Sequence, residues 1–305
     1  MSTEQRARPG AASEADPRAA SHRDEAWGIA LGLLTPLLWS SSGLFVKILP
    51  IAPVPLAGLR ALIAGVTLAP FSRPRGIKPA ALLTPALAVL LVAYTLSVLC
   101  YVSSVRLTTA ANAIALVSTA PAWVVALTWL AERRVRWELA WPVALVLIGV
   151  AAILSEPAAG RSLEGNLLGL GGGLAFGLFT FFLPRVRLPA VERVALCNLV
   201  AAAVLFAAAP ESFLAVRLSA LNWLAMAYLG AIQIGLATVC FAAALARISA
   251  ARASVLVLLE PLLSPLWVYL AIGEAPSRYG LVGGMFILGG IAVNLFARRP
   301  RAAKV

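Results

Sequence analysis

The stretch CYVSSVRLTTAANAIALVSTAP, residues 100–121, returns in altered form 140 positions later as CFAAALARISAARASVLVLLEP, residues 240–261. Aligned without a gap, the two stretches share seven identities: Cys100/Cys240, Ala110/Ala250, Ala111/Ala251, Ala113/Ala253, Leu116/Leu256, Val117/Val257 and Pro121/Pro261. When a gap of two residues is allowed, the match continues from WLAE at 129–132 to YLAIGE at 269–274. The chain therefore contains an internal repeat.

The composition indicates a membrane protein. Of the 305 residues 61% are hydrophobic and 12% are charged, and the mean hydropathy is +0.91. A soluble protein is about half apolar and about a quarter charged. Runs of 17 or more mostly apolar residues predict membrane-spanning helices. Ten such spans are predicted, at about 27–49, 54–71, 79–105, 108–130, 137–155, 164–183, 190–209, 218–243, 248–272 and 278–297.

The repeat divides the ten spans into two halves of five, residues 27–155 and residues 164–297. Trp39 in the first span then corresponds to Phe176 in the sixth. Because five is odd, the second half must enter the membrane from the opposite side. Inverted repeats of this kind are typical of secondary transporters, whose solute site lies between the halves near the membrane midplane. The predicted fold is all-α, with ten transmembrane helices in two inverted five-helix repeats.

The positive charges follow the predicted topology. Nineteen of the 25 Lys and Arg residues lie in the terminal segments 1–26 and 298–305 or near the connections after even-numbered spans, and five lie after odd-numbered spans. Arg60 is the remaining one. This asymmetry places both tails in the cytoplasm, with the protein in the inner (cytoplasmic) membrane. It also accounts for the net charge of +12 without a nucleic-acid partner. The polar N-terminal segment is predicted to be a disordered tail.

The sequence offers few residues that could bind a metal or a cofactor, or that could hydrolyse ATP. The single histidine, His22, and the last aspartate, Asp24, lie in the N-terminal tail, and three cysteines lie within spans without CxxC spacing. Neither a metal cluster nor an aspartyl pair can be built from these residues in the membrane. A GxxxxGK[ST] loop is absent from the sequence. We therefore expect no metal, no cofactor and no enzyme activity.

A carboxylate interrupts the ninth span. In LVLLEPLLSPLW, residues 256–267, Glu260, Ser264 and Trp267 fall on one helical face. A charge near the membrane midplane costs about 2.5–3.5 kcal/mol unless it faces water or a partner. Helix prolines free backbone carbonyls, which is tolerated where they line a cavity. Glu260 is thus either a site for a substrate amine or a proton, or a protonated glutamate in a structural hydrogen bond.

Similar polar and aromatic stripes occur on several other spans. Thr35, Trp39 and Ser42 share a face of the first span, and Tyr94, Ser97, Tyr101 and Ser104 share one of the third. Local hydrogen bonding within the membrane is the alternative explanation. The predicted substrate-binding residues are Trp39, Ser42, Tyr94, Tyr101, Ser118, Trp123, Phe176, Thr180, Gln233, Glu260, Ser264 and Trp267.

Two cations lie toward the outer ends of the first two spans. Lys47 is placed where its ammonium can reach the interface. Arg60 lies about 9 Å inside the predicted boundary at a rise of 1.5 Å per residue. We expect Arg60 to face a pore or to pair with a carboxylate. The glycines at 165, 169, 173 and 177 recur every fourth residue and predict a groove for close helix packing.

Taken in order, these motifs resemble the drug/metabolite transporter superfamily, in its ten-helix EamA-like branch. The resemblance covers about residues 27–297. It is carried by LLTPLLWSSSGLFVK (33–47), LAGLRALIAG (56–65), LVSTAPAWVVALTWLAE (116–132), LGLGGGLAFGLFTFF (168–182) and LLEPLLSPLWVYLAIGE (258–274). The resemblance implies the transport of amino acids, other metabolites or drugs, since aromatic amino acid exporters share the ten-helix plan.

The predicted function is secondary transport of small organic solutes, in particular export of amino acids or related metabolites by alternating access. The alternatives are a drug or multidrug exporter of the same fold, a channel, and an intramembrane enzyme. The expected partners are a small-molecule substrate and the lipid bilayer, with the protein as a monomer or homodimer.

Overall fold

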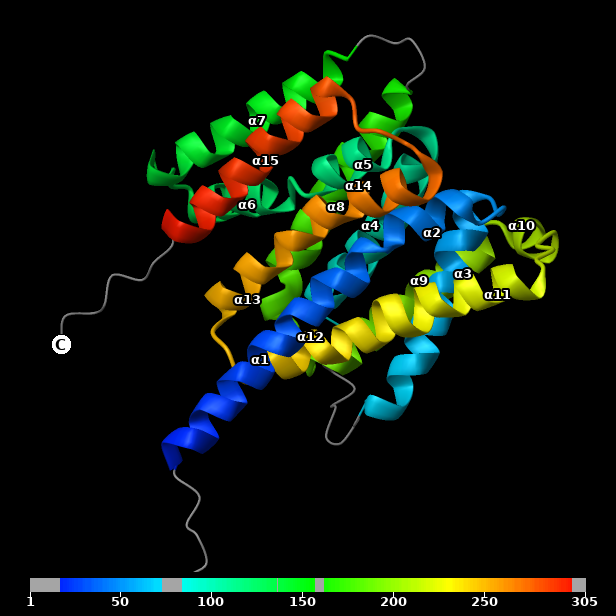
Figure 1. Cartoon of the computed structure of the whole chain (residues 1–305), viewed down its shortest axis with the longest axis horizontal. Coiled ribbons are helices and arrows are strands. Elements are labelled where there is room, and N and C mark those ends of the chain that lie inside the picture. Colours follow the sequence, from blue (N-terminus) through cyan, green and yellow to red (C-terminus); the bar gives the residue numbers. More distant parts are fainter. Residues whose placement is uncertain (1–16, 73–83, 136, 157–161, 298–305) are drawn as a thin grey trace, which may run out of the picture.

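A computed structural model describes residues 17–72, 84–135, 137–156 and 162–297, and the elements of this part of the chain are helical (Figure 1). The first half contains α1 (Pro17–Ser40), α2 (Ser42–Ile48), α3 (Pro53–Leu68), η1 (Ala69–Phe71), α4 (Pro85–Leu107), α5 (Ala110–Val117), α6 (Ala120–Glu132), η3 (Trp137–Leu139) and α7 (Ala140–Leu154). The second half contains α8 (Leu163–Phe182), η4 (Leu183–Arg185), α9 (Ala190–Ala208), α10 (Pro210–Leu214), α11 (Ala220–Ala227), η5 (Tyr228–Leu236), α12 (Ala237–Leu245), α13 (Ala250–Val257), α14 (Leu259–Ile272) and α15 (Arg278–Ala297).

These elements form ten consecutive spans, numbered 1 to 10 below. Eight helical segments of the described chain are long and apolar enough to cross a membrane. Two further apolar helices, α7 and α15, stand at the fifth and tenth predicted positions. The ten-helix fold predicted from the sequence is therefore confirmed. Because ten is even, α1 begins and α15 ends at the same end of the bundle, the terminal end. The connections after odd-numbered spans form the far end.

The helix α1 starts earlier than the first predicted span. It begins at Pro17, inside the segment 1–26 that the sequence predicts to be a tail, and residues 1–16 lie outside the described residues. Two ion pairs hold this extension to the connection between spans 8 and 9. Asp24 is 4.0 Å from Arg247, and Glu25 pairs with Arg252. The predicted tail 298–305 also lies outside the described residues.

Spans 4 and 9 are broken at corresponding positions. The helices α5 and α13 are each eight residues long, and their bounds differ by 140 positions, as the repeat requires. Thr109 and Ser249 cap their N-termini, each accepting a hydrogen bond from the backbone N–H three residues on. Each break is followed by a proline near the start of the next helix, which has no N–H for a helical bond.

The two spans also end alike. Arg133 after α6 and Gly273 after α14 both adopt the left-handed conformation, with φ of 51° and 73°. Their numbers again differ by 140, so the two-residue gap introduced into the sequence alignment is wrong. The gap was introduced to align Glu132 with Glu274, whereas the ungapped register aligns the two C-cap residues, a position where glycine is favoured.

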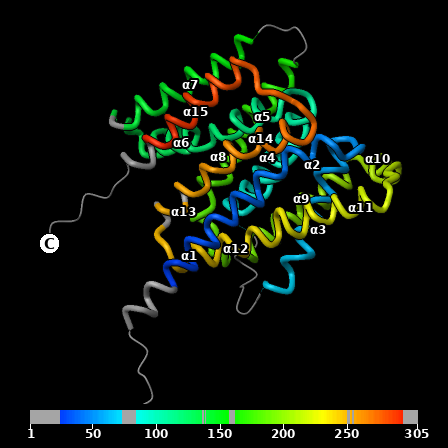
Figure 2. Tube along the Cα trace, viewed as in Figure 1, coloured from blue at the N-terminus to red at the C-terminus, as the bar shows by residue number. Residues whose placement is uncertain are grey.

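Contacts between the two halves occur in corresponding pairs, in which the roles of the first and second half are exchanged. Spans 3 and 6 pack together as α4 and α8, and spans 8 and 1 pack together as α12 and α1. In the same way α6 packs on α8, and α14 packs on α1. Spans 5 and 10, α7 and α15, run side by side at one edge of the bundle (Figures 1 and 2). This exchange is what an approximate two-fold axis between the halves produces.

The regularly spaced glycines of α8 form the contact with α4, α5 and α6. A Cβ on Gly165 would lie 2.8 Å from the backbone of Leu107, and one on Gly173 would lie 2.6 Å from the carbonyl oxygen of Leu116. Both distances are shorter than a side chain tolerates, so these positions exclude larger residues. The close approach predicted from the glycine spacing is therefore present, and it brings span 6 against spans 3 and 4.

Candidate solute site

The break in span 1 is a meeting point of four spans. The helix α1 ends at Ser40 and α2 begins at Ser42, and we call residues 40–42 the serine hub. Each serine side chain is hydrogen-bonded to a different neighbouring span. The bonds run from Trp267 Nε1 to Ser40 Oγ (2.9 Å, span 9), between Ser41 Oγ and Tyr228 Oη (3.0 Å, span 8), and from Tyr101 Oη to Ser42 Oγ (3.0 Å, span 3).

Trp39, immediately before the hub, is held by span 8. Its carbonyl oxygen accepts a hydrogen bond from Gln233 Nε2 at 3.2 Å, and its ring lies 5.4 Å from the ring of Phe241. Gln233 is buried within the π-helix η5. A π-helix widens the backbone spiral locally and is frequent at functional sites. Gln233 Oε1 has no hydrogen-bond partner within the described residues, so one acceptor remains for a further group.

Next to the serine hub, aromatic rings lie close to the cation of Arg60. The guanidinium carbon of Arg60, on α3, lies 5.6 Å from the centre of the Tyr101 ring, within the range of cation–π attraction. Tyr94, two helical turns before Tyr101 on α4, also interacts electrostatically with Arg60. The Tyr94 ring is 5.3 Å from Phe179 on α8. The Arg60 side chain is only 8% exposed, and an ion pair with a carboxylate is absent among the described residues, so the expectation that it faces a pore or pairs with a carboxylate stays a prediction.

Glu260 enters this group from span 9. The break after α13 places Glu260 in the first turn of α14, where the helix dipole favours a carboxylate. Its side chain is half-buried and interacts electrostatically with Arg60 and Tyr101. One turn later Ser264 is buried at the crossing with α2. A Cβ on Gly43 would lie 2.7 Å from Ser264 Oγ, so a larger residue at position 43 would force this hydroxyl or α14 to move.

Four of the predicted site residues lie apart from this group. Ser118 is half-buried at the break of span 4, and Trp123 packs against Gly177 of α8. Phe176 is 42% exposed and stacks on Phe179 at 5.7 Å, and Thr180 is exposed and donates to the carbonyl of its own helix at Phe176. The structure therefore brings together Trp39, Ser42, Tyr94, Tyr101, Gln233, Glu260, Ser264 and Trp267 around the serine hub.

Sequence reasoning missed several members of the group. Ser40, Ser41, Tyr228 and Phe241 make contacts at the hub, and none of them was predicted. Three adjacent serines followed by Gly43 inside an apolar run are a signal for a broken helix, because serine side chains compete for backbone hydrogen bonds. The partners of these serines could not be read from the sequence, since they depend on how the spans pack.

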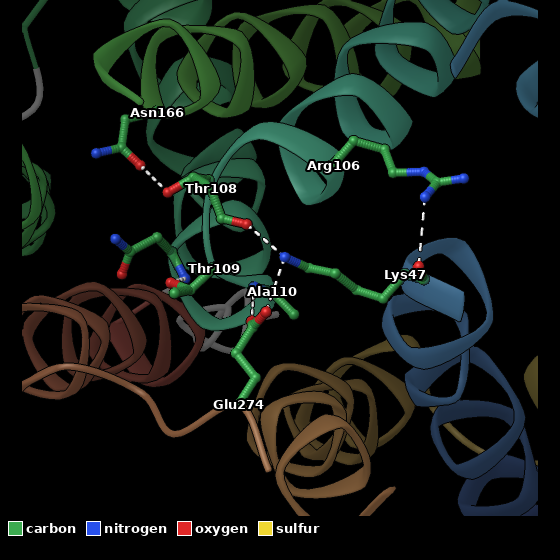
Figure 3. A network of polar contacts seen from close by, with 8 residues as sticks. Lys47, Arg106, Thr108, Thr109, Ala110, Asn166 and Glu274 are labelled. Atoms are coloured by element: carbon green, nitrogen blue, oxygen red, sulfur yellow. Dashed lines mark hydrogen bonds and ion pairs between the residues drawn. The ribbon is translucent and has the colours of Figure 1, made fainter. Parts of the chain in front are cut away.

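A polar network joins several spans at the far end of the bundle (Figure 3). Lys47 Nζ lies 2.8 Å from Glu274 Oε2 and donates to the carbonyl of Thr108, also at 2.8 Å. Glu274 Oε1 accepts a 2.8 Å hydrogen bond from the backbone N–H of Ala110, at the start of α5. Lys47 was expected to reach the interface, and the structure pairs it with a carboxylate. We call Lys47, Glu274 and their bonds to Thr108 and Ala110 the far-end latch.

Further contacts surround the latch. Arg106 donates to the carbonyl oxygens of Lys47, Leu49 and Ile51, and Thr108 Oγ1 donates to Asn166 Oδ1 at 2.8 Å. Spans 1, 3, 4, 6 and 9 are therefore joined at one level (Figure 3).

The chemistry around the hub suits binding of a small polar molecule. Hydroxyl, indole and amide groups supply hydrogen bonds, and Arg60 and Glu260 supply one charge of each sign. In the described part of the chain, groups of three or more His, Cys, Asp or Glu side chains that could hold a metal are absent.

A ten-span helical bundle with paired broken helices around a polar centre is the architecture of a secondary transporter. The chain belongs to the EamA-like transporter family, whose model matches residues 26–155 and again residues 163–296. It is therefore a multi-pass membrane protein of a family of transporters.

The chain is also similar to an uncharacterized transporter from Archaeoglobus fulgidus. The two are 28% identical over 200 residues, which is 65% of this chain and 72% of the relative. A solved crystal structure resembles the fold with a TM-score of 0.60 and 23% identity, covering 90% of this chain and 98% of the other. This second likeness concerns the fold alone.

Proposed function

We propose that the protein exports amino acids or related small metabolites across the cytoplasmic membrane by alternating access. The observation that carries this proposal is the serine hub, where the broken span 1 is bound by spans 3, 8 and 9. Discontinuous helices at the midplane are where transporters of this architecture bind their solutes. Around the hub, aromatic rings and opposite charges form a site suited to a small solute with an apolar part and charged groups.

The far-end latch supports the alternating-access part of the proposal. With the termini in the cytoplasm, as the charge distribution predicts, the far end is the external side. The Lys47–Glu274 pair then joins spans 1 and 9 across the external entrance. The two side chains are only 15% and 24% exposed, so breaking the pair costs more than breaking an exposed pair, about 0–1 kcal/mol, unless water or solute replaces the lost partners. Opening it releases solute to the outside, and closing it returns the site to the cytoplasm.

Counterflow in proteoliposomes tests the proposed function. Vesicles containing purified protein are loaded with one unlabelled amino acid, and uptake of the same labelled amino acid is followed across all twenty. We expect a transient overshoot of label for at least one of them, with a rate that saturates. Linear, unsaturable flux without overshoot would identify a channel instead. Ethidium, a lipophilic cation, is included because overshoot with it alone would favour the drug-exporter alternative.

Trp267→Phe provides a matched variant for the same assay. It retains an aromatic ring but removes the hydrogen bond to Ser40 Oγ. Trp223→Phe is the control, since Trp223 is 44% exposed on α11, away from the hub. We expect the first variant to lower the counterflow rate several-fold and the second to leave it unchanged. Equal counterflow rates in the two variants would show that the hydrogen bond of Trp267 at the serine hub has no part in transport.

A further inference from the structure

Arg60 is a buried cation whose guanidinium keeps donors that are unbonded within the described part of the chain. Its side chain is 8% exposed, and within the described residues its Nε and Nη1 atoms have no hydrogen-bond partner. A cation buried among apolar helices costs several kcal/mol unless it has a partner or reaches water. The neighbouring Tyr101 offers the face of its ring, at 5.6 Å, and this contact leaves the N–H groups of the guanidinium unbound.

Other arginines within the spans are bonded differently. Arg106 donates to three backbone carbonyls at the end of span 1, and Arg193 donates to two carbonyls beside span 6, at 2.8 and 3.1 Å. These two side chains complete breaks in the helical backbone and have a structural role. Arg60 lies in the middle of the regular helix α3 and bonds to no such break. Its position is therefore not explained by helix capping.

The groups that face Arg60 define a small charged site. Tyr94 and Tyr101 approach from α4, and Glu260 approaches from α14. Arg60 and Glu260 interact electrostatically, while no direct ion pair between them is present among the described residues. Arg60 Nε and Nη1, which have no hydrogen-bond partner among the described residues, therefore remain as donors in the neighbourhood of Glu260.

We propose that Arg60 binds the carboxylate of the transported solute, and that Glu260 is the counter-ion of Arg60 when the site is empty and the partner of an ammonium group when the solute carries one. A guanidinium presents a planar fork of donors that matches a carboxylate in a bidentate pair, and such pairs are short and strong. The solute class is therefore small organic acids, including amino acids. This inference rests on the proposed function, because it assigns the chemistry of the same site.

The proposed binding of the solute carboxylate is tested in the wild-type protein with ligands that are matched except for one functional group. Purified full-length protein in detergent is titrated with L-phenylalanine, L-leucine and L-alanine, with their amides, and with the corresponding acids that lack the amino group. Binding is measured by isothermal calorimetry or by the shift in melting temperature. We expect at least one acid to bind tenfold or more tightly than its amide. Equal binding of acid and amide, or binding by none of the acids, overturns the role of Arg60.

Two substitutions test whether Arg60 is responsible for the preference for acid over amide. Arg60→Gln should abolish the preference for acid over amide, whereas Arg60→Lys keeps the charge without the fork and should retain part of it. Arg217→Gln is the control, because it removes the same charge from an exposed side chain that bonds its own loop carbonyls. If Arg60→Gln fails to fold, the acid-to-amide ratio of Arg60→Lys decides. An unchanged ratio in the Arg60 variants overturns the proposal.

The outcomes separate this inference from the proposed function. Counterflow of a solute without a carboxylate, together with equal binding of acids and amides, would leave a transporter whose Arg60 has no solute contact. Loss of counterflow for every solute would remove the proposed function itself.

Discussion

The broken spans 4 and 9 have nearly the same backbone and different chemistry. Both consist of an eight-residue helix, a break and a longer helix that ends in a left-handed residue, at positions 140 apart. In span 4 the residues after the break are apolar: Ala120 and Val124 stand where span 9 has Glu260 and Ser264. The repeat therefore accounts for the shape of the break, while Glu260 and Ser264 are particular to span 9.

The second helices of the two spans are buried to a similar extent. Among the described residues α6 buries Ala120 and Val125, and α14 buries Ser264 and Val268. The two helices have different but corresponding neighbours, since α6 packs on α8 while α14 packs on α1 and α2. The difference between the two spans therefore lies in their side-chain chemistry, because span 9 alone carries a carboxylate directly after the break.

Among the substitutions that test the comparison of spans 4 and 9, the largest effect on transport is expected for the carboxylate of Glu260. Glu260→Gln keeps the shape and hydrogen bonding of the side chain but cannot ionise. We expect flux to fall by roughly tenfold or more, equivalent to about 1.4 kcal/mol or more, and its dependence on pH to weaken, because the side chain can no longer ionise to bind an ammonium group or a proton. Flux against pH is measured for both proteins. Coinciding profiles would make Glu260 a structural residue, as its counterpart Ala120 is.

An intermediate effect is expected at the crossing of α2 and α14. Gly43→Ala places a methyl group 2.7 Å from Ser264 Oγ, so either this hydroxyl must rotate or α14 must shift. Overpacking of this kind costs about 1–3 kcal/mol, and we expect several-fold slower counterflow. The double variant Gly43→Ala with Ser264→Ala removes the obstructing oxygen and should recover most of the rate. Additive losses in the double variant would show that the contact is not the cause.

The smallest effect is expected at the C-caps. Arg133 holds a left-handed conformation that costs a residue other than glycine about 1–2 kcal/mol. Arg133→Gly should therefore raise the free energy of unfolding by about 1 kcal/mol, and Gly273→Ala should lower it by a similar amount. Thermal or denaturant unfolding in detergent measures both. Changes of the same sign at the two positions would contradict the equivalence of the caps.

The sequence predicts the fold well because hydrophobic runs and charge asymmetry are local signals. Ten spans follow from run length, and the corresponding breaks in spans 4 and 9 agree with the paired prolines. The C-cap at Arg133 was missed, since an arginine gives no sign of a left-handed residue. Likewise, the start of α1 at Pro17 was missed, and the pairing of its Asp24 and Glu25 with Arg247 and Arg252 could not be read from the local sequence.

The site was only partly predictable for the same reason. Helical spacing places Glu260, Ser264 and Trp267 on one face, and the structure gives all three contacts near the hub. Spacing cannot show which face meets which neighbour. Phe176 was chosen because it corresponds to Trp39, yet Phe179, one turn later, is the ring beside Tyr94. The pairing of Lys47 with Glu274 joins residues more than two hundred positions apart and has no local signature.

The side from which a thiol at the serine hub can be labelled tests alternating access most directly. Ser41→Cys is introduced after Cys100, Cys197 and Cys240 have been replaced, and a membrane-impermeant maleimide is applied to intact cells or to inverted vesicles. With the far-end latch closed, we expect labelling in inverted vesicles and little in cells. Glu274→Gln removes the charge that holds Lys47, so it should raise labelling in cells and lower it in inverted vesicles. Labelling that is equal from both sides and unaffected by Glu274→Gln would contradict alternating access.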